Sequence, residues 1–416
     1  MVMGKRREIG ELTIGYEWET LLLNKYGLPL KFEEIEHFIS KIRNEVPSSR
    51  TGVDWVPRLD RALFEIRSGV LRNRVELEER TIKTVKATLE LAKKEEFRFL
   101  PLGSYPPVGS AVGFHIHTGS WEKTEGLQEI ANSLYPYVPC FAALSVNSPF
   151  WGMNPSHPPS EVKSYRLKYH AQLMSIPYYC APDLSYLSWE PDITVKFLSH
   201  PTIELRIPDT PLSMEFVCEI TVFVSSFIRE SIKHLKPFSK QNFTEGIDNR
   251  IRAMRDGLQA IFLWEGKERK VTEILNEMIK TAYPTLKAIG YEELPLIKKM
   301  IRKRQTQADF LSYLFNNYNG DIYDFTTYLS SGLNLLKNPF QRYLNFIPKL
   351  PTKDLMDINE YLLSMIGKRT RYGILYRVLY QPTDVFEKRV WELKEKKLID
   401  IQFDYEKGTL FSKHSD

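Results

Sequence analysis

Two segments of this sequence place a pair of chemically active side chains two positions apart. Glu17 and Glu19 form one such pair, and His115 and His117 form the other. In a β-strand, residues two positions apart share a face, so each pair would lie opposite the apolar residues beside it. Two carboxylates this close repel each other, which a protein tolerates at a solvated surface or around a cation. Histidine suits a metal, a phosphate or a proton transfer.

Two further segments pair a glutamate with an arginine at the same spacing. Glu65 precedes Arg67, and Glu204 precedes Arg206, with large apolar residues on the opposite face. Either pair alone would be interpreted as a surface ion pair worth about 0.5 kcal/mol. The four segments together are more specific. If their apolar faces join one core, their polar faces lie side by side.

The combined polar face would hold more negative charge than it can keep without help. Its acidic and imidazole members are Glu17, Glu19, Glu65, Glu204, His115 and His117. So many carboxylates do not all stay ionised close together unless cations are present. Oxygen-rich sites with imidazole suit Mg²⁺ or Mn²⁺, and Arg67 and Arg206 would then serve anionic ligands. The residues therefore predict metal-assisted phosphoryl or carboxyl chemistry, with a solvated sheet face as the alternative.

Several other kinds of site are disfavoured. The sequence contains no Gly-x-x-x-x-Gly-Lys loop, no Gly-x-Gly-x-x-Gly and no Gly-x-Ser-x-Gly. The three cysteines are far apart and form no Cys-x-x-Cys pair, so neither a disulfide framework nor a cysteine zinc site is expected. The formal net charge of +5 is small for 416 residues and does not argue for nucleic acid.

The sequence predicts a soluble, cytoplasmic protein. Its N-terminal segment 1–10 is charged and lacks the apolar core of a signal peptide. The longest apolar stretches, such as 220–228, are too short to span a bilayer. Hydrophobic residues make up 43% of the chain, which is enough to build a large core.

Alternation of apolar and polar residues predicts strands in the four polar segments. Their ranges are 12–23, 63–70, 111–119 and 201–208. Apolar spacings of three and four residues predict helices around and after them. These ranges are 32–46, 74–97, 215–235, 249–264, 271–289 and 321–336. The strand signal ends at about residue 245, so residues 1–335 are predicted to form an α+β domain in which helices flank an antiparallel sheet.

A second domain is predicted over residues 336–416. The segment 336–353 contains three prolines, which indicates a boundary. Beyond it the pattern predicts three short helices and a β-hairpin, the outline of a winged helix. The ranges are 357–366, 371–380, 384–397, 398–403 and 409–413. This part is only slightly basic, so a domain that contacts protein is favoured over one that binds DNA.

The order of the motifs resembles the type-2 glutamate–cysteine ligase family of carboxylate–amine ligases. The match covers roughly residues 10 to 330, through the segments 15–19, 65–70, 113–117, 144–152, 202–209 and 249–258. The resemblance implies the fold of glutamine synthetase. It also implies an ATP-dependent reaction in which a carboxylate, the γ-carboxylate of glutamate, is phosphorylated and an amine then displaces the phosphate to form an amide.

The resemblance further implies roles for individual residues. The implied ligands of Mg²⁺ or Mn²⁺ are Glu17, Glu19, Glu65, His115 and Glu204. His117 and Arg255 would contact ATP, while Arg206 would face the γ-phosphate and the acyl phosphate. Arg206, Glu204 and Arg67 are the candidate catalytic residues, and Arg67 and Arg166 are candidates for binding the carboxylate substrate. Metal ions and arginines together would neutralise the negative charge of ATP and acyl phosphate.

The chain departs from the family pattern in two places, the segments 153–159 and 189–194. Two other functions stay open. One is a ligand-sensing regulator that binds DNA through its C-terminal domain, and the other is a phosphoryl transferase such as a guanidino kinase. The expected partners of the ligase are glutamate and an amine, and a homo-oligomer is compatible with the superfamily.

Overall fold

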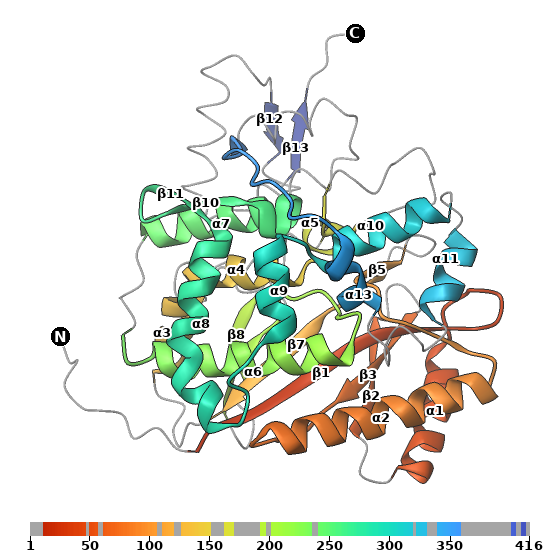
Figure 1. Cartoon of the computed structure of the whole chain (residues 1–416). Helices are drawn as coiled ribbons and strands as arrows, with labels where there is room; N and C mark the ends of the chain where they lie inside the picture. The colour runs from red at the N-terminus through yellow and green to blue at the C-terminus, as the bar shows by residue number, and fades with distance from the viewer. Residues whose placement is uncertain are drawn as a thin grey trace.

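An antiparallel sheet lies at the centre of the structure, a computed structural model (Figure 1). The described residues are 11–46, 50–56, 61–105, 110–119, 126–150, 162–169, 192–196, 201–234, 240–318, 322–330, 339–358, 401–404 and 409–412. Across the sheet the strand order is β2 (Arg50–Val56), β3 (Arg61–Arg67), β1 (Thr13–Leu23), β7 (Phe114–Gly119), β9 (Thr202–Leu205) and β8 (Ile193–Lys196). A short strand, β4 (Arg98–Leu100), also pairs with β1.

The four strands expected from the polar pairs occupy consecutive positions in this sheet. In the strand register, Glu17 lies opposite Arg67 on one side and opposite His115 on the other. His117 in turn lies opposite Glu204. This register confirms that the four polar segments are neighbouring strands of one sheet. The edge strands β2 and β8 were not among the predicted strands.

The opposite face of the sheet is apolar and is covered by helices. These helices are α1 (Phe32–Glu45), α2 (Arg74–Lys94) and α6 (Met214–Ser231). The ring of Phe38 in α1 lies 5.7 Å from that of Phe64 in β3. Thr81 in α2 forms a 2.7 Å hydrogen bond with the hydroxyl of Tyr16, and Thr118 in β7 donates to Ser225 in α6. Burial of each large side chain such as Phe64 contributes roughly 1.5–3 kcal/mol to the free energy of folding. This burial keeps the polar face of the sheet directed away from the helices.

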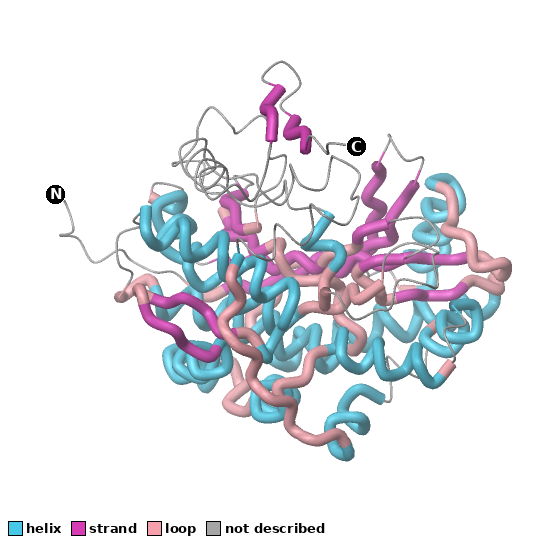
Figure 2. The backbone as a smooth tube through the Cα atoms, turned by 90° about the horizontal axis from the view of Figure 1, so that it is seen from above, coloured by secondary structure: helices cyan, strands magenta, loops and turns pink. Residues whose placement is uncertain are grey.

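Helix α6 is almost completely buried, as its apolar sequence predicts. Its first turn is capped by Ser213, whose hydroxyl accepts the N–H of Phe216. An outer layer covers it with α8 (Val271–Ala288) and α9 (Pro295–Lys303). The layers of helices alongside the strands are visible from above in Figure 2. None of the described helices is both long and apolar enough to cross a membrane.

The remaining elements surround this core. The helices are α3 (Leu127–Leu134), α4 (Val138–Ser145), α5 (Tyr165–Tyr169), α7 (Lys240–Asp256), α10 (Gln307–Asn317), α11 (Ile322–Leu329) and α13 (Pro339–Phe346). Short strands form three separate hairpins, β5 (Ser104–Tyr105) with β6 (Ser110–Ala111), β10 (Ile261–Trp264) with β11 (Lys267–Lys270), and β12 (Ile401–Asp404) with β13 (Thr409–Ser412).

The predicted helix 249–264 is wrong in its second half. Helix α7 ends at Asp256, and Gly257 follows with a φ of +53°, in the left-handed region that favours glycine. Strand β10 comes next and pairs with β11 across a turn in which Glu265 and Gly266 both have positive φ. This hairpin shows that strands continue beyond residue 245, so that part of the prediction is wrong.

The C-terminal predictions are tested only in part. The hairpin of β12 and β13 lies where the sequence predicts one. The predicted helices lie outside the described residues except for the first two positions, so the winged helix and the division at residue 335 stay predictions. The described segment 339–358 packs on the preceding helices. Phe340 of α13 lies 5.8 Å from Phe310 of α10, and the Lys353 N–H donates to the Gln259 carbonyl.

The buried carboxyl group of Glu219 in α6 predicts a pH dependence of stability. Its oxygens accept the N–H groups of Leu296 and Ile297 at the start of α9, yet burial raises the pKa of Glu219 from 4.5 to about 8. The folded state therefore binds more protons than the unfolded state between these values. The contribution of Glu219 to the free energy of unfolding is full below about pH 4.5 and falls as the pH rises to about 8.

The Glu219→Gln variant should lack this part of the pH dependence. Denaturant unfolding at mildly acidic and mildly alkaline pH would measure it, with the difference between wild type and variant isolating the single group. A variant whose stability changes with pH as steeply as the wild type would contradict the assignment.

Candidate active site

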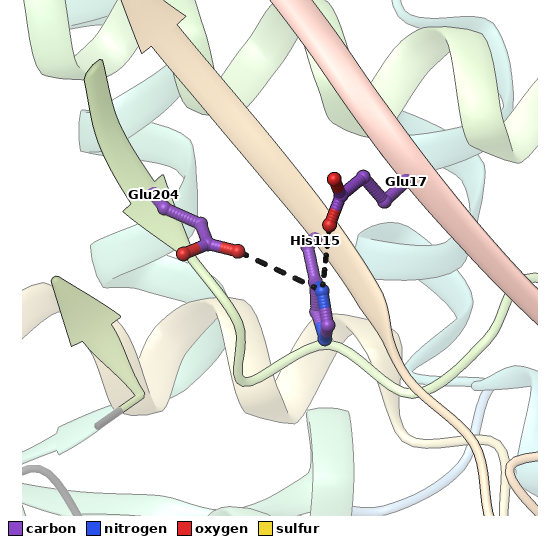
Figure 3. A group of neighbouring side chains, drawn as sticks. All are labelled: Glu17, His115 and Glu204. Atoms are coloured by element: carbon purple, nitrogen blue, oxygen red, sulfur yellow. Dashed lines mark hydrogen bonds and ion pairs between the residues drawn. The ribbon is translucent and has the colours of Figure 1, made fainter. Parts of the chain in front are cut away.

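Three side chains from neighbouring strands converge on the polar face of the sheet (Figure 3). Nδ1 of His115 in β7 lies 3.3 Å from Oε2 of Glu17 in β1 and 3.6 Å from Oε1 of Glu204 in β9. Nε2 of His117 lies 3.8 Å and 3.7 Å from the same two oxygens. Both imidazoles therefore face the same pair of carboxylates. These distances alone do not distinguish a metal ligand from a contact to the nucleotide.

Glu19 and Glu65 extend the cluster toward β3. They are directly opposite in the strand register, and both are buried. Oε1 of Glu19 lies 3.5 Å from Nε2 of His115, and its Oε2 accepts the N–H of Gly113 at 2.6 Å. Nε of Arg67 donates to Oε2 of Glu65 at 2.6 Å. His115 thus has one ring nitrogen toward Glu17 and Glu204 and the other toward Glu19.

The electrostatics of the cluster reflect crowded buried charges. Burial would raise the pKa of Glu17, but the hydrogen bonds and charges of His115 and His117 outweigh it and hold that pKa far below its usual range. Burial, assisted by the charge of Glu19, raises the pKa of Glu65 to about 7 even though Arg67 opposes the shift. Neighbouring carboxylates of this kind compete for the available positive charge.

His115 and Glu204 respond to the same crowding in opposite directions. Burial would lower the pKa of His115, yet the carboxylates of Glu19 and Glu17 raise it. Burial would raise the pKa of Glu204, yet Arg206 and the two imidazoles lower it. The cluster therefore favours a proton on His115 and an ionised carboxylate at Glu204.

The donor set fits a divalent metal ion. Ligand atoms of Glu17, His115 and Glu204 all lie within 4.8 Å of one another. Nε2 of His117 is buried and has no hydrogen-bond partner within the described parts of the chain. Unsatisfied buried polar atoms are costly, so a ligand that pairs them would stabilise the site. Carboxylate oxygens with imidazole suit Mg²⁺ or Mn²⁺.

The two arginines predicted to bind anions differ in their surroundings. Arg206 is largely buried, and its Nη1 donates to Oε1 of Glu204 at 2.6 Å. Arg67 has a side chain that is 44% exposed, and its Nε lies 4.0 Å from Oε1 of Glu17. Arg206 is therefore part of the buried floor of the cluster, by which we mean its largely buried side chains. Arg67, in contrast, can reach a molecule that arrives from solvent.

Arg166 contacts the backbone that carries Arg206. Its guanidinium donates to the carbonyls of Arg206 and Ile207 at 3.0 and 2.9 Å and lies 3.6 Å from Oδ1 of the buried Asp209. A Cβ at Gly113 would come within 2.5 Å of this guanidinium, so a larger residue there would have to displace the Arg166 side chain. These contacts hold the backbone at Arg206 in position. The predicted binding of substrate by Arg166 stays a prediction.

Arg255 lies on α7 and has a different environment. Its guanidinium donates to both carboxylate oxygens of Asp256, at 2.8 to 3.0 Å. Asp256 is almost completely buried and also pairs with Lys353. The predicted contact of Arg255 with ATP stays a prediction.

Sequence reasoning missed three side chains that hold the cluster at its β8 edge. Nζ of Lys196 lies 3.1 Å from Oε2 of Glu204, and the hydroxyl of Thr202 lies 3.2 Å from Nδ1 of His117. Asp192 accepts hydrogen bonds from Arg250 of α7, while its carbonyl accepts the N–H of Arg206. For Lys196 the alternation of β8 would have been the only signal, and four residues are too few to stand out.

Solved structures define the class of fold. The chain resembles glutamate–cysteine ligase from Francisella tularensis, solved in complex with AMP, with a TM-score of 0.58 and 12% identity over 95% of each chain. It also resembles a bifunctional glutathione synthetase from Pasteurella multocida, with a TM-score of 0.53 and 13% identity over 98% of this chain and 58% of that one. The fold is thus the mixed helix and antiparallel-sheet fold of glutamate–cysteine ligase.

Sequence relatives point to the same group. A Bradyrhizobium sp. (strain BTAi1) protein named "Putative glutamate--cysteine ligase 2" is 28% identical over 50% of this chain and 55% of its own length. One of the same name from Solibacter usitatus is 23% identical over 66% of this chain and 82% of its own. The chain thus spans about half the length of several such relatives. No family model matches it. The resemblance predicted from the motif order is confirmed by these relatives.

The cluster predicts Mn²⁺ binding that depends on individual carboxylates. Glu17→Gln and Glu204→Gln should each weaken Mn²⁺ binding at least about tenfold, because each removes a charged oxygen ligand. Titration calorimetry without nucleotide would measure the dissociation constants. Glu90→Gln on the exposed face of α2 is the matched control and should bind Mn²⁺ like the wild type. Unchanged binding in both cluster variants would contradict the assignment.

Proposed function

We propose that the protein is an ATP- and divalent-metal-dependent carboxylate–amine ligase that forms a γ-glutamyl amide through an acyl phosphate. The observation that supports this most is the convergence of Glu17, His115 and Glu204 beside Arg206 on one buried sheet face. The names of the sequence relatives support glutamate as the acid. The nucleotide follows from the same resemblance, and the AMP complex of the Francisella protein agrees with it.

The proposed reaction has two group-transfer steps. A carboxylate oxygen of glutamate attacks the γ-phosphorus of ATP, the bond from that phosphorus to the bridging oxygen breaks, and ADP leaves. The amine nitrogen then attacks the carbonyl carbon of the acyl phosphate, the carbon–oxygen bond to phosphate breaks, and the amine proton passes to solvent. The sum converts ATP, acid and amine into ADP, phosphate and amide.

We assign each residue a role in this reaction from its position in the site. Glu17, Glu19, Glu65, His115 and Glu204 would hold the metal ions, which supply positive charge to the phosphates when bound. Arg206 would hold the transferred phosphoryl group, since its guanidinium lies in the floor of the cluster. Arg67 would orient the substrate carboxylate, because it is the more exposed of the two arginines. His117 would contact the nucleotide phosphates from the strand next to Glu204.

Burial of the floor suits a reactive intermediate. Glu204 is 0% exposed, and His115, Glu19 and Glu65 are also buried. Charges in such surroundings interact more strongly than in water, and fewer water molecules reach an acyl phosphate. The regulator and guanidino-kinase alternatives are not favoured, because the named relatives are ligases.

ADP release should require all three substrates and a divalent ion. We expect purified protein to form ADP with Mg²⁺ or Mn²⁺, glutamate and an amine such as cysteine, and to form much less when any one is omitted. Mass spectrometry should find one amide per ADP. ADP formed with a single acceptor and no amide would favour the phosphoryl transferase instead, and no ATP binding at all would remove the proposal.

Replacement of Arg206 should mainly reduce the chemical step. Removing one preorganised donor to developing charge costs about 10²–10³ in kcat, so Arg206→Met should lose activity on this scale while still binding ATP. Steady-state kinetics and nucleotide binding would be compared with Arg302→Met, an exposed arginine on the outer helix α9. A kcat near that of the control would exclude the assigned role.

A further inference from the structure

Lys196 ends the edge strand β8 on the polar face of the sheet. Ile193 and Val195 of this strand are buried, whereas Thr194 and Lys196 are partly exposed, so the two sets lie on opposite faces. Nζ of Lys196 lies 3.1 Å from Oε2 of Glu204, and its side chain is 35% exposed. The ammonium group therefore borders both the buried cluster and solvent.

Glu204 already has positive partners on its other oxygen. Nη1 of Arg206 lies 2.6 Å from Oε1, and His115 and His117 face this oxygen as well. Lys196 forms an ion pair with the second oxygen, Oε2, at 3.1 Å. The carboxylate of Glu204 thus lies between an arginine at one oxygen and a lysine at the other.

We propose that Lys196 binds the transferred phosphoryl group of ATP, across Glu204 from Arg206. The inference rests on the proposed ligase function and adds a residue to it. The terminal phosphoryl group spreads negative charge over three oxygens, so it needs cations from more than one direction. A planar guanidinium on one side and a mobile point charge on the other satisfy this need.

The exposure of Lys196 agrees with a ligand-binding role. A cation held by Glu204 would take up the negative charge that Lys196 now faces, which leaves the ammonium group available to an arriving anion. A lysine that only neutralised Glu204 would make the same ion pair without any preference among nucleotides. The two roles therefore differ in how they respond to the terminal phosphates.

The experiment compares a nucleotide that has the terminal phosphates with one that lacks them. The dissociation constants of AMP-PNP and AMP are measured by calorimetry in the presence of Mn²⁺. Lys196→Met should raise the dissociation constant of AMP-PNP about tenfold or more and leave that of AMP unchanged, because only the longer nucleotide reaches the ammonium group. Lys196→Arg should restore most of the affinity.

Lys86→Met is the matched control, because Lys86 is an exposed lysine on α2, behind the apolar face of the sheet. It should bind both nucleotides like the wild type. Equal weakening of AMP and AMP-PNP by Lys196→Met, or no weakening of either, would overturn the proposal. A wild-type protein that binds neither nucleotide would instead remove the ligase function on which the proposal rests.

A second measurement on the unchanged protein does not depend on how the variant folds. Acetic anhydride modifies accessible lysines, and mass spectrometry reports the modified fraction of Lys196 with each nucleotide. AMP-PNP with Mn²⁺ should protect Lys196 several-fold, while AMP should not. Equal modification under both conditions would overturn the assignment.

Discussion

Repulsion among buried carboxylates determines which ligands the polar face of the sheet can bind. Glu17, Glu19, Glu65 and Glu204 lie on one face of the sheet within the consecutive strands β3, β1, β7 and β9, and three of them are almost completely buried. Such a group is unstable in isolation, since each carboxylate raises the cost of ionising the next. The chain surrounds it with arginine, lysine and imidazole, and the remaining need for positive charge is what makes the face suited to cations and phosphates.

The apolar face of the same strands keeps this crowded arrangement in place. Period-two alternation gives Glu17, Glu65, His115 and Glu204 a buried apolar neighbour on each side along the strand, whereas Glu19 and His117 are each followed by a buried threonine. Helices α1, α2 and α6 pack on those neighbours, so turning a carboxylate away from the cluster would expose large apolar surface. The backbone of Arg206 is further fixed by Arg166 on its carbonyl and by Asp192 on its N–H.

The sequence was sufficient to predict the central strands and most of the cluster. The spacing of two between Glu17 and Glu19, and between His115 and His117, determines which residues share a face. This follows from the local geometry of a strand. Which strands are neighbours is a long-range property that spacing alone does not specify. The prediction of one site therefore rested on the assumption that the apolar faces share a core, and the motif resemblance supported that assumption.

The features that sequence reasoning missed have physical explanations. Lys196 lies on a strand of four residues, which is too short to show clear alternation. The contact of Arg166 in α5 with the Arg206 carbonyl joins segments that are 40 residues apart in the chain. The hairpin after α7 was assigned to a helix because its turn uses Glu265 and Gly266 with positive φ, whereas Asn-Gly is the stronger signal.

Cation binding by this cluster is tested most directly by a crystal structure with Mn²⁺ and an ATP analogue, with the metal located by its anomalous scattering. We expect manganese peaks between the carboxylates of Glu17 and Glu204 and the imidazole of His115, with the terminal phosphate of the analogue beside Arg206. Manganese bound elsewhere, or an analogue seated away from this face of the sheet, would contradict this expectation.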